Sequence, residues 1–138
     1  MELALINKEN MPKDFVENLH STIFDSFIES DYFRYDSCLF AKEGDELISY
    51  VMVREVSSET AEMAWGGTSK KHRGLKSVDA FKLFVDYLHK DYENVGFQTW
   101  NRNYPMIKLG LSYKFVITGT RASNNGDLFV IFNKKRGE

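Results

Sequence analysis

The segment TAEMAWGGTSKKHRGLKSVDAF, residues 60–81, joins a predicted strand to a predicted helix through a strongly basic loop. Residues 60–68 have the pattern of a strand, and the paired glycines Gly66 and Gly67 are typical of a β-bulge. Beyond the loop, a predicted helix over 77–92 carries apolar residues at the three-and-four spacing of one helix face: Val78, Phe81, Val85, Leu88 and Tyr92.

The loop KKHRGLKS, residues 70–77, has the features of a phosphate-binding turn. A glycine-containing loop that leads from a strand into a helix presents unpaired backbone N–H groups and the positive end of a helix dipole. We expect Ser77 or Asp79 to cap the helix, and His72 to lie in an exposed loop against solvent or phosphate. A solvated, lysine-rich surface loop is the alternative interpretation. The positive charge comes from Lys70, Lys71, Arg73 and Lys76.

The segment after the helix completes a βαβ unit. VGFQTW, residues 95–100, returns as a strand, which we expect to run parallel to the strand at 60–68. A ligand site in this unit requires the two strands to part at their carboxyl ends, near Thr68 and Trp100.

The other elements are predicted from periodicity and turn residues. They are a helix over 12–29, a short helical turn over 31–36, a hairpin of 38–43 with 47–56, a short helix over 103–115 and a hairpin of 115–121 with 127–132. Together they predict a single domain over 1–138 of the α/β (α+β) class. Its sheet is mixed and mostly antiparallel, with a central βαβ unit and flanking helices.

This order of elements and the basic loop resemble the Gcn5-related N-acetyltransferase (GNAT) superfamily, whose members bind acetyl-CoA and acetylate amines. RGLKSVDAF, residues 73–81, resembles the family's RGxGxGxxL loop in a degenerate form. Lys76 and Val78 stand where the family has small residues, which let the backbone approach a pyrophosphate closely. The matching positions are Arg73, Gly74 and Phe81.

Two further segments carry the resemblance. AEMAW, residues 61–65, is similar to a segment of histone-acetylating members in which the glutamate is the general base. NYPMIKLGLSYKF, residues 103–115, resembles the family's NxxAxxLYxKxGF. Gly110 takes the place of the usual tyrosine, the family's general acid, and Lys114 takes the place of a glycine. The matching positions are Asn103, Met106, Leu109 and Phe115.

The resemblance implies a set of site residues. Glu62 is the candidate general base, and Tyr113 or Ser112 is a candidate for reprotonating the thiolate. Each has an ordinary alternative: Glu62 as a solvent-facing strand carboxylate and Tyr113 as a packing residue. Asn103 either caps the short helix, which we favour, or binds pantetheine. The candidate acetyl-CoA-binding residues are Gly66, Gly67, Thr68, Arg73, Gly74, Lys76, Ser77 and Asn103.

Two features stay open from the sequence. Alternation places Glu62 on the opposite face of its strand from Met63 and Trp65, without telling which face meets the core. Trp65 and Trp100 are expected in the core, although each lies near the carboxyl end of a strand and could border an acceptor pocket.

Composition and charge limit the classes of function. The net charge of −2 gives no bulk attraction to nucleic acid, so any basic site has to be local. The longest apolar runs are too short to cross a bilayer. Cys38 has no intramolecular partner, and three scattered histidines offer no metal-ligand spacing. With no signal-peptide pattern at the start, we expect a cytoplasmic protein without a metal.

Three functions compete on this basis. The first is an acetyl-CoA-dependent N-acetyltransferase, with acetyl-CoA as acyl donor and an amine of a small molecule or protein as acceptor. The second is a GNAT-fold protein, of the kind encoded by some phages, that has lost catalysis and binds a protein partner or a second copy of itself. Lys76, Val78 and Gly110 favour that alternative. The third and weakest, a nucleic-acid-binding domain, rests only on charge clustered at 70–76 and 133–136.

Overall fold

The computed structural model describes residues 1–7 and 36–138. The predicted helix over 12–29 and nearly all of the predicted turn over 31–36 lie outside the described residues. None of the helices in the described ranges has the length and apolar character that a membrane span requires. The elements of this part are β1 (Glu2–Asn7), β2 (Ser37–Glu43), β3 (Glu46–Ser57), β4 (Thr60–Thr68), the 3₁₀ helix η2 (Lys70–His72), α3 (Leu75–Leu88), β5 (Asn94–Trp100), α4 (Tyr104–Ser112), β6 (Val116–Ala122) and β7 (Leu128–Lys135).

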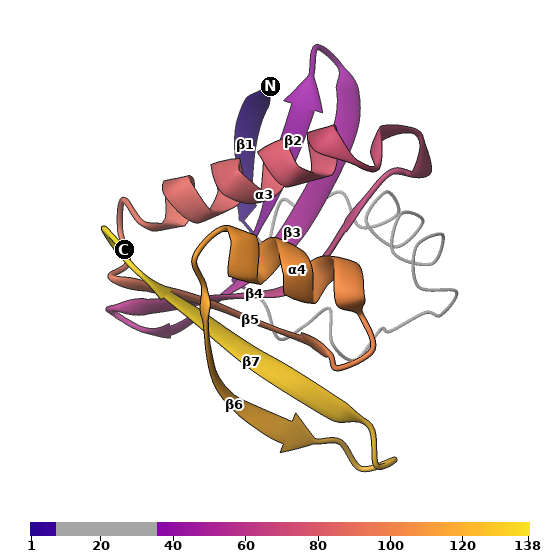
Figure 1. Ribbon diagram of the computed structural model, residues 1–138. Coiled ribbons are helices and arrows are strands. Elements are labelled where there is room, and N and C mark those ends of the chain that lie inside the picture. Colours follow the sequence, from indigo (N-terminus) through magenta and orange to yellow (C-terminus); the bar gives the residue numbers. More distant parts are fainter. Residues whose placement is uncertain (8–35) are drawn as a thin grey trace.

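The described strands form one sheet in the order β1-β2-β3-β4-β5-β7-β6. β4 and β5 are parallel, and every other neighbouring pair is antiparallel. This confirms the predicted mixed sheet with a central βαβ unit. The helix of this unit, α3, and the next helix in the chain, α4, lie on the same side of the twisted sheet (Figure 1).

The core lies between α3 and the sheet. Of the predicted apolar face, Phe81, Val85 and Leu88 are nearly inaccessible and Val78 is half-buried, and Ala80 and Phe84 are buried beside them. The predicted bounds of 77–92 were wrong, because the helix runs from Leu75 to Leu88. Tyr92 continues the spacing, but it follows the helix and donates a hydrogen bond from its hydroxyl to Glu55 Oε1 at 2.7 Å. The helix ends at Leu88 and β5 begins at Asn94, so Tyr92 lies in the connection between them.

The strand β1 was not predicted. ELALIN alternates over only six residues, too few to separate a strand from an extended end by pattern alone. Its pairing decides the matter, since β1 runs antiparallel to β2 from Glu2 opposite Lys42 to Asn7 opposite Ser37.

α4 rests on a group of aromatic rings beneath it. Phe97 and Phe132 stack with their centroids 4.6 Å apart, and a Cβ atom at Gly110 would come within 2.7 Å of the Phe97 ring. Gly110 weakens helix propensity, but the close approach of α4 to β5 requires it. After the helix, Lys114 takes a left-handed φ of 66°, and Phe115 N donates to Gly110 O at 3.0 Å. Lys114 therefore occupies a C-terminal capping position that favours glycine.

Candidate functional site

The parallel strands β4 and β5 are paired only over their first halves. Their register runs from Thr60 opposite Asn94 to Met63 opposite Phe97. Beyond that point β4 pairs only with β3, while β5 continues along β7 as far as Trp100. The two strands therefore part toward their carboxyl ends, as a ligand site in this unit requires.

We call the opening between β4 beyond Met63 and β5 beyond Phe97 the fork. A bulge shapes its β4 side. Gly66 lies opposite Val51 and Met63 opposite Val53, so two residues of β4 face one residue of β3. The bulge predicted from the glycines is confirmed, immediately before them. A Cβ atom at Gly66 would lie 2.8 Å from Tyr50 O, so the close approach of the two backbones explains this glycine.

The start of α3 is bare as far as the described residues show. Gly74 is the N-cap residue, with φ 105° and ψ −130°, and no described side chain caps the helix. The N–H groups of Leu75 and Lys76 have no acceptor among the described residues. The prediction that Ser77 or Asp79 caps the helix was wrong, because the helix begins at Leu75. Ser77 lies in the first turn, and its hydroxyl donates to Gly74 O at 2.7 Å.

Carboxylates from the β2–β3 turn hold most of the loop's cations. Lys71 Nζ and His72 Nε2 each lie 2.8 Å from Glu46 Oε1, and Lys76 Nζ lies 2.7 Å from Glu43 Oε2. The hydrogen bonds from Lys71 and His72 lower the pKa of Glu46 to about 2. The hydrogen bond from Lys76 likewise lowers the pKa of Glu43. The expectation that His72 is exposed was wrong, since it is 7% exposed and packed beside the turn that binds it.

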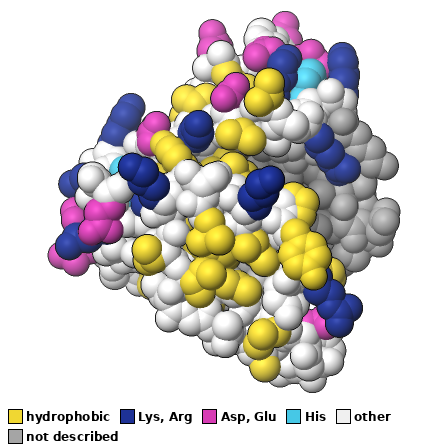
Figure 2. Space-filling model, viewed as in Figure 1, with side chains coloured by type: hydrophobic (Ala, Val, Ile, Leu, Met, Phe, Trp, Pro, Cys, Tyr) yellow, Lys and Arg dark blue, Asp and Glu magenta, His cyan; other side chains and the backbone are white. Residues whose placement is uncertain are grey.

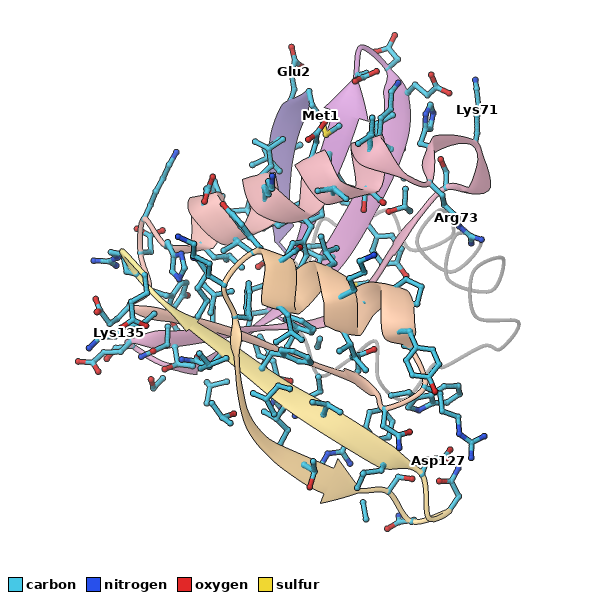
Figure 3. All side chains as sticks on the ribbon, in the orientation of Figure 1. Met1, Glu2, Lys71, Arg73, Asp127 and Lys135 are labelled. Carbon is cyan, nitrogen blue, oxygen red and sulfur yellow. The ribbon has the colours of Figure 1, made fainter. Side chains whose placement is uncertain are left out.

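Arg73 differs from its neighbours. Among the loop cations whose side chains are described, it alone has no carboxylate partner in the described part of the chain. Figure 3 shows Lys71 and Arg73 leaving the loop in different directions, with Lys71 beside the β2–β3 hairpin and Arg73 away from it. Within the described part of the chain, no carboxylate pairs with the guanidinium next to the bare amides.

Glu62 lies close to the point where the strands part. It is opposite Gly96, one residue before the last pair of the β4–β5 register. Ala61 and Met63 belong to the core under α3, so alternation puts Glu62 on the other face of the sheet. There its carboxylate pairs with Arg54 Nη2 of β3 at 3.2 Å, and its side chain keeps 21% exposure.

Hydroxyl groups cluster at the carboxyl end of β4. Ser49 of β3 donates to Gly67 O at 2.8 Å, and Thr68 Oγ1 donates to Ser49 Oγ at 3.2 Å. Thr68 therefore ties β4 to β3. The next hydroxyl, Ser69 Oγ, is buried with no hydrogen-bond partner among the described residues. A buried hydroxyl without a partner next to the basic loop was not anticipated from the sequence.

On the β5 side, Asn103 caps α4. Its Oδ1 accepts from Met106 N at 3.4 Å, and its Nδ2 donates to Thr99 Oγ1 at 3.0 Å, which confirms the capping role that we favoured. The prediction that Trp100 lies in the core was wrong, since it is 54% exposed. Val95, Phe97 and Thr99 take the buried face of β5, so Trp100 points the other way. The side chain of Trp65 lies outside the described part.

Tyr113 lies apart from the bare amides. Its hydroxyl donates to Asp86 Oδ1 at 2.7 Å, and Lys82 Nζ and Lys134 Nζ lie 5.6 Å and 4.9 Å from the ring centroid. Burial, together with the hydrogen bond to Asp86, raises the pKa of Tyr113 to about 12. Asp86 follows Leu75 by eleven residues, about 17 Å along the helix axis. The structure thus places Tyr113 beside the far half of α3.

Solved structures match this arrangement along the whole chain. A GNAT family acetyltransferase from Elizabethkingia anophelis with acetyl-CoA bound shares 16% identity, and the match covers 96% of this chain and 97% of that chain, with a TM-score of 0.70. The chain has the GNAT fold. Ard1 from Thermoplasma volcanium matches at 13% identity, over 100% of both chains, with a TM-score of 0.74. Arabidopsis thaliana NAA60 in complex with acetyl-CoA matches at 16% identity, over 99% of both chains, also at 0.74. No family sequence model and no curated protein sequence matches the chain.

Within this GNAT fold the predicted site residues, with the exception of Tyr113, fall into three groups. Those from Gly66 to Ser77 follow the β4 side of the fork and the start of α3, Glu62 lies where the fork opens, and Asn103 caps the helix on the β5 side. Tyr113 is separate from all three. Sequence reasoning missed two residues of this region, Glu43 and Glu46. The acidic turn EGDE was the available signal, but no local sequence pattern links it to a loop some 25 residues later.

Proposed function

We propose that the protein is an acetyl-CoA-dependent N-acetyltransferase that transfers an acetyl group to an amine of a small molecule or a protein. The observation that carries the proposal is the parting of β4 and β5 beside an uncapped helix start. Bare amides at the positive end of a helix are suited to a diphosphate. The acetyl-CoA bound in structures of the same fold supports the same assignment.

The residues at the start of α3 fit a diphosphate-bearing ligand. Among the described residues, an added Cβ atom at Gly74 has no neighbour within 4 Å, so none of them fills the space beside the first N–H groups of α3, which we call the mouth. The N–H groups of Leu75 and Lys76 and the guanidinium of Arg73 would hold the phosphates. Ser69 Oγ is a further donor without a partner in the described part. Gly66, Gly67 and Thr68 would line the path of the pantetheine along β4.

Glu62 is assigned to the proton transfer that the reaction needs. When bound, acetyl-CoA supplies a thioester carbonyl; the C–N bond to the acceptor forms as the C–S bond breaks. Before its nitrogen can attack, the acceptor ammonium has to lose a proton. The Glu62 carboxylate near the fork would accept that proton, directly or through one water, while Arg54 fixes its orientation.

The position of Tyr113 does not favour the prediction that it donates a proton to the thiolate. Its hydroxyl would first have to leave Asp86, to which it is bound at 2.7 Å. We therefore expect Tyr113→Phe to change turnover by less than about twofold. A large loss of turnover with unchanged acetyl-CoA binding would restore the tyrosine to the mechanism.

The first experiment is thermal unfolding with and without acetyl-CoA, with adenosine as the control that lacks the diphosphate. A ligand at one hundred times its dissociation constant adds about 2.7 kcal/mol of stability. For a chain of 138 residues the unfolding entropy is about 0.29 kcal/mol/K, so Tm should rise by about 9 °C. No rise with saturating acetyl-CoA would contradict the proposal.

The second experiment tests Glu62. We expect Glu62→Gln to lower turnover at neutral pH by about 10²-fold or more and to leave the Kd for acetyl-CoA unchanged. Glu59→Gln removes an exposed carboxylate from the preceding turn and serves as the control. Equal turnover in the two variants would remove Glu62 from the role of base.

A binding protein without catalysis is the second candidate. Three observations favour it: Lys76 is held by Glu43, Glu62 is held by Arg54, and Tyr113 lies apart from the fork. A rise in Tm with acetyl-CoA, but no acetylation of a panel of primary amines and peptide N-termini, would select this function over the transferase.

A further inference from the structure

The β2–β3 turn and the loop before α3 form a patch of mixed charge. The turn EGDE, residues 43–46, presents three carboxylates, and the loop at 70–77 presents the cations. Figure 2 shows acidic, basic and histidine side chains gathered over the β2–β3 turn and this loop. The loop is therefore much closer to neutral than its sequence suggests.

The two carboxylates that bind the loop do so in different ways. Glu46 binds His72, which is 7% exposed, and so anchors the 3₁₀ turn to the hairpin. Glu43 binds Lys76 where both side chains are 42% exposed. Lys76 belongs to the first turn of α3, next to the amides that have no acceptor. An exposed ion pair of this kind contributes little to stability and exchanges partners readily.

We propose that Glu43 acts as an internal counter-ion that competes with a phosphate ligand for Lys76. In the free protein Lys76 is held at the turn, so the described groups left for a phosphate are the amides, Arg73 and Ser69 Oγ, without the Lys76 ammonium. Removing the Glu43 charge releases Lys76 to the ligand and tightens binding. Glu43 is in this sense a positioning residue, which acts through Lys76. The inference builds on the proposed function where the ligand is acetyl-CoA, but the competition applies to any phosphate bound at this helix start.

The test is a double-mutant cycle measured by isothermal titration with inorganic pyrophosphate and, separately, with acetyl-CoA. The variants are Glu43→Gln, Lys76→Gln and the pair together. Glu93→Gln is the matched control. Glu93 pairs with Arg136 at a distance of 3.8 Å, and this ion pair is not part of the mouth. We expect Glu43→Gln to lower the Kd about two- to fivefold at 50 mM NaCl, and less at 200 mM. In the Lys76→Gln background, and in Glu93→Gln, we expect no change.

Each outcome decides the matter. A Kd that is unchanged or higher in Glu43→Gln, or lowered equally with and without Lys76, overturns the competition. If pyrophosphate follows the expected cycle and acetyl-CoA does not bind, the competition stands and the proposed function fails. If acetyl-CoA binds and Glu43→Gln has no effect, the competition fails and the proposed function stands. Binding of neither ligand to the wild type overturns both. The Tm of each variant without ligand confirms that it is folded.

Discussion

The backbone at Gly74 offers the sharpest test of how the mouth is built. Its φ of 105° and ψ of −130° lie in a region that residues with a Cβ atom rarely enter. A Cβ atom there meets none of the described residues within 4 Å, so with respect to this part of the chain a substitution acts through backbone strain. We expect Gly74→Ala to destabilise the protein by about 1–3 kcal/mol. With an unfolding entropy of about 0.29 kcal/mol/K, Tm should fall by about 3–10 °C.

The same strain at a second glycine separates stability from binding. Gly126, in the β6–β7 turn, has a φ of 88°, and an added Cβ atom there would likewise have no neighbour within 4 Å among the residues that the structure describes. Gly126→Ala should therefore cost a similar free energy of unfolding. Only Gly74→Ala should also weaken acetyl-CoA binding, because Gly74 sets the direction of the first N–H groups of α3.

The assay is urea unfolding of both variants, followed by titration with acetyl-CoA below their midpoints. A Gly74→Ala protein as stable as the wild type would refute the strain. Equal loss of acetyl-CoA affinity in Gly74→Ala and Gly126→Ala would refute the assignment of the mouth to the start of α3, since the loss would then follow stability alone.

Three further predictions concern α4 and its end. Lys114→Gly should stabilise the protein by about 0.5–1 kcal/mol in urea unfolding, because glycine adopts the left-handed φ of 66° without strain. Gly110→Ala should destabilise it by about 1–3 kcal/mol in the same assay, because the added Cβ atom would lie 2.7 Å from the Phe97 ring. Tyr113 has its pKa raised from 10.0 to about 12 in the folded state, so its contribution to stability is present below pH 10 and is lost as the pH rises through 12. The hydrogen bond to Glu55, together with burial, raises the pKa of Tyr92 to about 12 as well, so ultraviolet titration should show a late ionisation that shrinks by one tyrosine in Tyr113→Phe and does not vanish.

Local patterns predicted most of the fold. The apolar spacing of α3, the turn residues of the hairpins and the paired glycines of β4 act between neighbours in the chain, so they can be interpreted without knowing the fold. The parallel pairing of β4 with β5 follows from the βαβ order, because such crossovers have one favoured geometry. The same patterns missed β1 and misplaced the ends of α3, where pairing and the start of β5 set the limits.

The candidate site likewise has features that local sequence determines and features that only the tertiary structure determines. The sequence by itself determined that a basic, glycine-containing loop leads directly into a helix, because the residues involved are adjacent. Only the tertiary structure decided that Glu43 and Glu46 neutralise that loop, that Glu62 lies on the face away from α3, and that the Tyr113 hydroxyl binds Asp86. Each of these depends on residues far apart in the chain, or on which face of a strand meets the core. The packing of the sheet against α3 sets both, and no short-range pattern records either.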